Sequence, residues 1–232
     1  MGRAFTRAAA ALGVRRTVPF LVALTPFGMV CGIAAQGQGL SVLEASLMSA
    51  LVFAGSSQLL VLGQWAHPAP VLAAALAAFA VNLRMALMGP VLAPWLDRVR
   101  GWRLWGSLFV MTDQNWAMSV QEMRQGRGDA ACLFGSGVLL WVAWLLTTVA
   151  GHAVGAALRP PAGHPVFFAA LAVFVAILVP MWRGRADALP WVVAAGVALL
   201  VSRLLPGTSW HIVAGALAGA GAGAWRDRRR AA

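Results

Sequence analysis

Charged residues are scarce in this sequence, and both tyrosine and lysine are absent. Only 11% of the 232 residues are charged and 60% are hydrophobic, whereas soluble domains carry about 25% charged residues. A soluble fold of this length could not bury so much apolar surface. The composition therefore argues against a disordered chain, an ordinary cytosolic enzyme and a nucleic-acid-binding domain. The net charge of +11 is the excess of 18 basic residues, all of them arginine, over 7 acidic ones. Most of the arginines lie in short gaps between apolar runs, as the positive-inside rule expects.

The apolar runs predict a polytopic all-α membrane protein that forms one integral membrane domain over residues 1–232. A transmembrane helix needs about 20 mostly apolar residues, and the alternation of a barrel strand is missing. The sequence contains eight candidate segments: 17–36, 43–65, 70–94, 104–121, 131–158, 165–182, 188–205 and 209–225. Most tryptophans fall near segment ends, which is typical of an aromatic belt; only Trp116, Trp141 and Trp144 fall deeper.

Arginine counting predicts that both termini are cytoplasmic. Each terminal region carries four arginines, which requires an even number of crossings. If all eight segments cross, 12 arginines lie inside and 5 outside; if segments two and four do not fully cross, the numbers become 15 and 2. Those two segments are also the polar ones. Because broken or re-entrant helices are tolerated only where they are buried in protein or line a cavity, we expect segments two and four to be broken.

Ionisable residues within apolar segments are the first candidates for a functional site. Arg84 lies in the middle of segment three, next to Asn82, and Asp113 lies in the middle of segment four. Opposite charges at similar depth are expected to pair. Two interpretations remain open: a substrate-binding or proton-linked site, and a structural ion pair that fixes two helices.

Segment two contributes the third polar cluster, at Gly55, Ser56, Ser57 and Gln58. Small residues allow backbones to approach closely, and the hydroxyl and amide groups suit an unwound turn. Alternatively, the hydroxyls bond to their own helix and Gln58 forms an interhelical hydrogen bond. The presence of polar clusters in neighbouring segments favours a shared binding site.

Proline and glycine mark two further features. Pro26 lies in the middle of segment one and predicts a kink, either beside a substrate cavity or beside a close helix contact at Gly28 and Gly32. Segment eight carries a smooth face of glycines at 215, 219 and 223, which predicts close packing, within the chain or with a partner subunit.

Several chemistries lack their signatures. The sequence contains no HExxH motif, P-loop or dinucleotide-binding fingerprint, its four histidines show no ligand spacing, and no base lies near Ser56 or Ser57. We therefore expect no enzyme activity, no cofactor and no metal. The two cysteines, Cys31 and Cys132, lie in apolar runs and are expected to be small core residues rather than a disulfide.

Four stretches, in order, resemble the AzlC family, the large subunit of branched-chain amino acid exporters. They are 18–32, Val52 to Gln58, Asn82-Leu83-Arg84, and Thr112-Asp113. The resemblance covers roughly residues 15–120. Met85 and Gln114 stand where the family often has a histidine and an acid, which removes a second titratable group from any proton path.

The resemblance implies a secondary transporter in the bacterial cytoplasmic membrane, with a small AzlD-like subunit of about four spans as partner. It implies export of leucine, isoleucine and valine, with methionine as a further candidate. Arg84 would hold the carboxylate, Asp113 the ammonium group or a proton, and the polar run of segment two would supplement either. The competing interpretation is a channel or a scaffold without coupled transport, but the concentration of polar residues in mid-segment favours an occluded site.

Overall fold

The computed structural model describes residues 5–63, 65, 71–158, 182, 184, 188–206 and 210–231, and the regular elements of this part are helices. Segment six, 165–182, lies outside the described residues except for Trp182. The helices are α1 (Arg7–Thr17), η1 (Val18–Phe20), α2 (Leu21–Gly37), α3 (Val42–Val52), α4 (Gly55–Gly63), α5 (Val71–Met88), η2 (Gly89–Leu92), α6 (Ala93–Leu96), α7 (Trp102–Phe109), α8 (Asp113–Arg124), α9 (Ala130–Leu158), α11 (Ala188–Leu204) and α12 (Trp210–Ala231).

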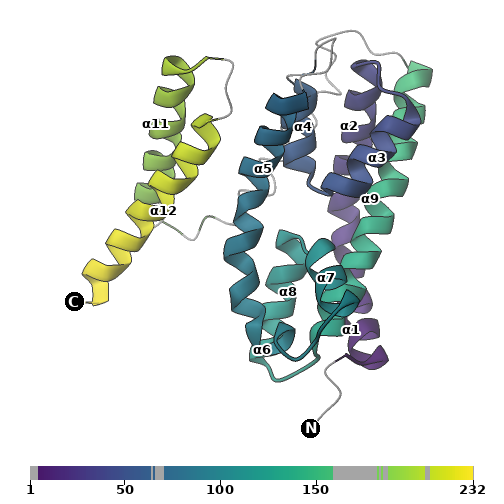
Figure 1. The fold of residues 1–232 in the computed structure, drawn as a ribbon, viewed down its shortest axis with the longest axis vertical. Helices are drawn as coiled ribbons and strands as arrows, with labels where there is room; N and C mark the ends of the chain where they lie inside the picture. The colour runs from purple at the N-terminus through teal and green to yellow at the C-terminus, as the bar shows by residue number, and fades with distance from the viewer. Residues whose placement is uncertain are drawn as a thin grey trace.

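Two continuous helices, Arg7–Gly37 and Ala130–Leu158, are long and apolar enough to cross a membrane. They lie side by side (Figure 1). A methyl group built at Gly32 would collide with the carbonyl oxygen of Thr148, and one at Gly151 with that of Met29. Small residues therefore let the two backbones touch, which confirms the close helix contact expected at Gly28 and Gly32.

The first helix begins earlier than segment one was predicted to begin. Thr6 is its N-cap and accepts a hydrogen bond from the Ala9 N–H at 3.2 Å. Arg15 and Arg16 therefore lie on a helix that packs against α9, and not in an extended tail. The apolar pattern did not predict α1, because arginine favours helix formation but lowers the hydropathy from which segment one was assigned.

Segment two is broken and turns back. Phe53, at the end of α3, has φ 42° and ψ 41°, the left-handed conformation that ends a helix and is rare for a bulky residue. Leu62, near the end of α4, lies in one buried cluster with Leu40 and Ala45, which flank the start of α3. Both ends of the segment therefore lie at the same end of the molecule (Figure 1).

Segment four is also broken, and it enters from the other end of the molecule. α7 ends before Val110, and α8 begins after Thr112. Trp102, at the start of α7, stacks edge-on against Phe5, and Glu122, near the end of α8, pairs with Arg16 at 3.2 Å. Both ends of this segment therefore lie beside the N-terminus, at the end of the molecule opposite to the ends of segment two.

The two breaks meet in the middle of the molecule. Phe53 and Val110 share a buried cluster with Cys31, Leu140 and Trp144. Glycine makes room for both breaks: a methyl group at Gly137 would collide with Val110, and one at Gly55 would lie 2.5 Å from Phe27 and 2.7 Å from Trp144. The expected breaks in segments two and four are therefore present, and α9 is the surface against which both of them lie.

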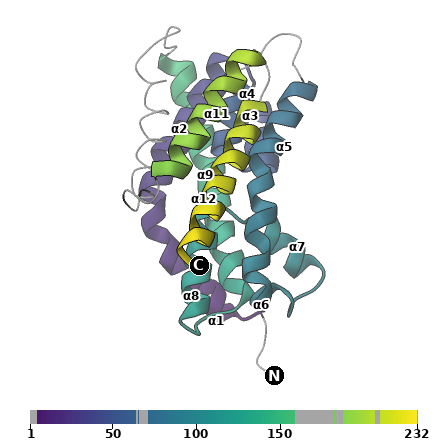
Figure 2. The same cartoon turned by 90° about the vertical axis from the view of Figure 1, so that its left-hand side faces the viewer.

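The helices α11 and α12 form a hairpin that lies beside α5 (Figures 1 and 2). The glycine face of α12 is turned towards α11. A methyl group at Gly215 would lie 2.8 Å from the carbonyl oxygen of Ala194, and one at Gly219 would lie 2.8 Å from the Ala194 side chain. Of the two uses that the sequence left open, the structure shows packing within the chain.

Candidate functional site

The amino-terminal end of α4 starts in the middle of the fold without a capping side chain at the preceding residue. The Gln58 N–H donates to the Ala54 carbonyl at 2.9 Å, which makes Ala54 the N-cap residue. Alanine has no side-chain oxygen to accept from the first N–H groups of the helix. The hydroxyl of Ser56 in the same turn is buried and has no hydrogen-bond partner among the described residues. This turn therefore offers donors and the positive end of a helix dipole to an acceptor.

Gln58, one of the predicted substrate-binding residues, lies in a hydrogen-bond network within the chain. Its Nε2 donates to Ser49 Oγ at 2.8 Å, and its Oε1 accepts from Trp144 Nε1 at 2.9 Å. Ser49 in turn donates to Thr148 Oγ1 at 3.1 Å. All four side chains are buried, with Gln58 only 1% exposed. The network joins both halves of segment two to α9. These are the interhelical hydrogen bonds that the sequence offered as the alternative to a substrate contact at Gln58.

Sequence reasoning missed the other members of this network. Ser49, Trp144 and Thr148 lie within apolar stretches, and Ser49 and Thr148 are fully buried. The signal that could have found them is weak: serine and threonine are the polar residues that transmembrane helices tolerate, and Trp144 is one of the three tryptophans placed away from segment ends. Trp141 likewise donates to the Ala50 carbonyl at 3.0 Å.

Helix α5 connects the two breaks. Near its middle, Asn82 Oδ1 accepts a hydrogen bond at 3.2 Å from the hydroxyl of Ser57 in the first turn of α4. Towards its end, the Met88 carbonyl accepts a hydrogen bond at 2.8 Å from Trp116 Nε1 in α8. The Asn82-Leu83-Arg84 stretch thus lies between the start of α4 and the start of α8.

Asp113 opens α8, and backbone geometry places it level with Arg84. α5 and α8 run in the same direction (Figure 1), Asp113 lies one turn before Trp116, and Arg84 lies one turn before Met88. Both residues therefore lie about one helical turn from the Trp116–Met88 hydrogen bond, on the side nearer to the middle of the fold. The Arg84 side chain lies outside the described residues, so the predicted pairing of the two charges stays a prediction.

The start of α8 is capped by its own chain, unlike the start of α4. Thr112 N–H donates to Asn115 Oδ1 at 2.7 Å, and the Asn115 N–H donates to Thr112 Oγ1 at 3.5 Å, which forms a capping box. Asn115 Nδ2 also donates to the Val110 carbonyl at 2.9 Å. The groups that the break in segment four exposes are therefore satisfied within the segment.

Aromatic and aliphatic side chains surround the break in segment two. Phe27 and Trp144 stack edge-on with ring centroids 5.4 Å apart, and Gly55 lies directly against both rings. α2 runs without interruption through Pro26, which immediately precedes Phe27 and has no N–H to donate to the preceding turn. The predicted cavity-lining role of Pro26 stays a prediction, but the residue lies next to the aromatic wall.

An ion-pair group at the N-terminal end of the molecule joins segment four to the N-terminal helix. Glu122 is 3% exposed and accepts from Arg127 at 2.7 and 3.0 Å, besides its contact with Arg16. The hydrogen bond from Arg127, helped by the positive charges of Arg127 and Arg16, lowers the pKa of Glu122 although burial opposes the shift. This carboxylate therefore stays charged at neutral pH.

The described part of the chain contains no cluster of potential metal ligands, and its two cysteines are buried. No group of three or more potential metal ligands occurs there, and His152 forms a hydrogen bond with the Leu40 carbonyl at 2.8 Å. His67 and His164 lie outside that part. Cys31 and Cys132 are free and buried, which confirms that they are core residues rather than a disulfide.

Comparisons with known proteins agree with the membrane interpretation. A family model described as AzlC protein matches residues 19–158, more than half of the chain. An uncharacterized membrane protein of Archaeoglobus fulgidus is 30% identical over 209 residues, covering 89% of this chain and 90% of that protein. The inner membrane protein YgaZ of Escherichia coli is 27% identical over 183 residues, covering 75% of this chain and 73% of YgaZ. No solved structure matches the chain significantly.

Proposed function

The chain belongs to the AzlC family of membrane proteins, a transporter family associated with branched-chain amino acid transport, and from this premise we propose that it is the large subunit of a secondary exporter. Its substrates are leucine, isoleucine and valine, with methionine as a further candidate. The whole chain, residues 1–232, acts as one integral membrane domain with both termini cytoplasmic, in the inner membrane. Two half-helices that enter from opposite ends and meet in the middle support this proposal, because transporters place substrates at such discontinuous helices.

The single observation that carries the proposal is the uncapped start of α4. Ala54 offers no side-chain cap to the first N–H groups, and the Ser56 hydroxyl has no partner in the described part of the chain; an acceptor bound here would satisfy them, because burying polar groups without hydrogen bonds is unfavourable. The carboxylate of an amino acid is such an acceptor, and the dipole of α4 favours its charge. Arg84, on the helix that bonds to this same turn through Asn82, supplies the second donor for the carboxylate.

The other end of the zwitterion is assigned to Asp113. It lies level with Arg84 in the backbone and opens α8, the half-helix that belongs to the segment entering from the other end of the molecule than α4. We assign it to the substrate ammonium group or to a coupled proton. Ser57 and Gln58 were candidate substrate ligands; their hydrogen bonds to Asn82, Ser49 and Trp144 give them the role of holding the α4 turn in place.

The side-chain pocket is assigned to the apolar groups around the breaks. Phe27, Phe53, Trp144 and Leu140 lie around the start of α4. Apolar walls favour leucine, isoleucine and valine over polar amino acids, but one methylene group contributes only about 1–3 kcal/mol. Discrimination among the three substrates is therefore expected to be modest.

A small AzlD-like subunit is proposed as partner on the strength of the family alone. The glycine face of α12, which the sequence offered as a partner surface, is occupied by α11. The partner is expected to bind elsewhere, on helix faces that are exposed in this chain.

The test is export of labelled leucine from vesicles that contain the full chain, with and without the small partner. Asp113→Asn should abolish saturable export, whereas Asp97→Asn, which changes an exposed carboxylate in the α6–α7 loop, should not. Normal export by Asp113→Asn would refute the assigned role. Flux that neither saturates nor responds to unlabelled valine would indicate a channel, and loss of all flux in both variants would indicate a folding defect.

A further inference from the structure

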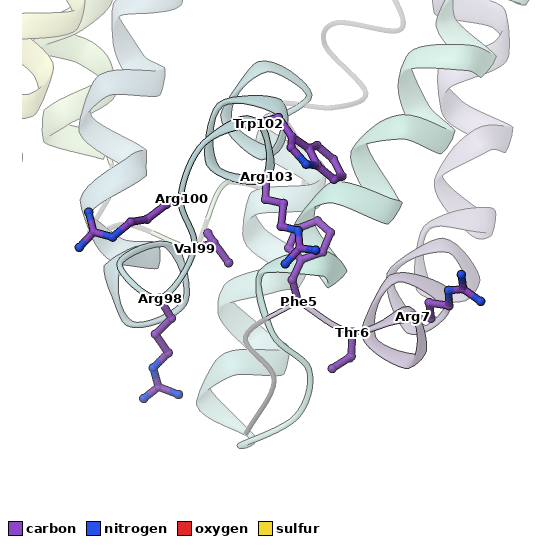
Figure 3. Close-up of a pocket in the computed structure, with 8 residues that line it drawn as sticks. All are labelled: Phe5, Thr6, Arg7, Arg98, Val99, Arg100, Trp102 and Arg103. Carbon is purple, nitrogen blue, oxygen red and sulfur yellow. The ribbon is translucent and has the colours of Figure 1, made fainter. Parts of the chain in front are cut away.

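A basic pocket of about 1110 Å³ opens at the end of the molecule that carries the N-terminus. Figure 3 shows that its lining comes from three stretches: the residues that lead into α1, the loop after α6, and the start of α7. The lining residues are Phe5, Thr6, Arg7, Arg98, Val99, Arg100, Trp102 and Arg103. The proposed amino acid site lies in the middle of the fold, so this pocket is separate from it.

Four of the eight lining residues are arginines, and their charges are not neutralised locally. Within the described part of the chain, no carboxylate lies within salt-bridge distance of Arg7, Arg98, Arg100 or Arg103. The half-buried Asp129 lies beside Thr6 and uses its carboxylate within the fold: it accepts from the Thr6 N–H at 3.0 Å and from the Ala131 N–H at 2.8 Å. The lining therefore carries an excess of positive charge, with the Arg103 side chain beside the aromatic rings and those of Arg7, Arg98 and Arg100 directed outwards around the rim (Figure 3).

Aromatic rings hold the pocket in shape. Phe5 stacks edge-on against Trp102 at 5.9 Å and lies 5.7 Å from Phe134 of α9. The Arg103 guanidinium lies 5.3 Å from the centre of the Phe5 ring and 5.8 Å from that of Trp102. Cation–π contacts fix this guanidinium while leaving its N–H donors available to a ligand.

An exposed aromatic face continues from the pocket along the outside of α7. Trp102, Trp105 and Phe109 occupy one side of the helix and are 64%, 70% and 50% exposed. α7 enters from the end of the molecule where the pocket opens and runs towards the middle. A ligand with an anionic head at the pocket and an apolar tail along α7 would cover both features, whereas a soluble anion would cover only the first.

We propose that this pocket binds the phosphate-bearing head group of an anionic phospholipid, whose acyl chains lie along the outer face of α7. Guanidinium groups match phosphate oxygens bidentately, and basic pockets at the membrane interface are suited to anionic head groups. The lipid would bridge the residues before α1 and the start of the re-entrant segment that carries Asp113.

The test compares lipids on the purified full chain in a neutral detergent. Phosphatidylglycerol, phosphatidylcholine and inorganic phosphate are each titrated, and the thermal unfolding midpoint is followed by tryptophan fluorescence. The variant is Arg98→Gln with Arg103→Gln. The matched control is Arg124→Gln with Arg228→Gln, which removes the same net charge at exposed positions outside the pocket. Midpoints in phosphatidylcholine alone report whether each variant is folded.

Phosphatidylglycerol, but not phosphatidylcholine, should raise the midpoint of the wild type and of the control pair. The pocket variant should need about 25-fold more phosphatidylglycerol for the same shift, since each arginine contributes about fivefold; Arg98→Lys with Arg103→Lys should restore part of the response, because lysine returns the charge without the bidentate fork. If both glutamine pairs lose the phosphatidylglycerol response equally, the proposal is overturned, because the lipid would then respond to the overall charge of the protein and not to this pocket. An equal shift with inorganic phosphate would overturn the lipid assignment in favour of a soluble anion.

Discussion

At the residue scale, Ser56 and Gln58 show how two neighbouring polar residues divide their roles. Gln58 donates and accepts within a buried network, whereas the Ser56 hydroxyl, two positions earlier, has no partner in the described part of the chain. Both residues stand in the same motif, and the sequence could not separate them. Their roles depend on which side chains α9 brings to the turn, and that is a property of the packed structure.

Substitution of each residue should therefore affect a different measurement. Gln58→Ala should lower the stability of the folded chain by about 1–2 kcal/mol, because Trp144 Nε1 and Ser49 would lose their partner. Ser56→Ala should leave stability unchanged and lower the apparent affinity for leucine. Thermal unfolding and leucine export, measured on both variants, check the prediction. The reverse result, with Ser56→Ala unstable and Gln58→Ala defective only in export, would contradict it.

Glu122 gives a pH dependence whose sign follows from its lowered pKa. A carboxyl group with a lower pKa in the folded state stabilises the fold fully above its ordinary pKa of about 4.3, and this stabilisation disappears as pH falls through the lowered value. The thermal unfolding temperature of the wild type should therefore show no loss from this group between pH 7 and about pH 5, and should decline as the pH falls below about 4.3. Glu122→Gln should have a lower midpoint at pH 7, since Arg16 and Arg127 lose their partner, and a shallower decline. Equal slopes for the two proteins would refute this role for Glu122.

At the element scale, the sequence predicted that segments two and four are broken, but it did not predict where their ends lie. The arginine balance and the polar residues in mid-segment pointed to both breaks. The positions of Phe53 and Val110 in one cluster, and of Leu62 beside Ala45, depend on tertiary contacts that hydropathy does not encode. The same limit applied to segment eight, whose glycine pattern predicted close packing without identifying the neighbour.

The neighbour of α12 can be tested with two substitutions in the same helix. Gly219→Leu should destabilise the chain by about 1–3 kcal/mol, because the added side chain would collide with Ala194 and the Pro190 carbonyl of α11. Gly221→Leu is the control, since nothing lies within 4 Å of the position where its side chain would start. Both variants are compared by thermal unfolding after expression without a partner, and by co-purification after expression together with the small subunit. An unchanged midpoint for Gly219→Leu, with reduced co-purification of the small subunit, would show that the face binds the partner.

At the scale of the whole molecule, residues 7–124 form in order the membrane-length helix Arg7–Gly37, the broken segment two, the helix α5, which runs back in the opposite direction, and the broken segment four, which enters from the other end than segment two; the second membrane-length helix, α9, follows (Figure 1). All-helical architecture and most segment boundaries followed from hydropathy, because a membrane requires long apolar runs. Helix α1 and the residues of the basic pocket did not follow, because hydropathy alone assigns arginine-rich stretches to loops.

This arrangement predicts that the loops on both sides of segment four face the cytoplasm. Cysteines introduced at Arg100 and at Gln125, in a background without Cys31 and Cys132, should react with a membrane-impermeant thiol reagent only from the cytoplasmic side. A cysteine at Gln38, between α2 and α3, should react only from the opposite side. Opposite accessibility of positions 100 and 125 would mean that segment four crosses the membrane, and the re-entrant arrangement would then be wrong.

The most direct measurement of the proposed amino acid site is the reactivity of a cysteine at Ser56. Ser56→Cys, in the same cysteine-free background, should react with a small water-soluble thiol reagent, and leucine at ten times its dissociation constant should slow the reaction about tenfold. Leu51→Cys is the control in the same segment: its side chain is 70% exposed on the outside of the chain, and lipid should keep it unreactive. Polar amino acids such as glutamate should not protect position 56. An inert cysteine at 56, or one that reacts at the same rate with and without leucine, would contradict the placement of the substrate at the start of α4.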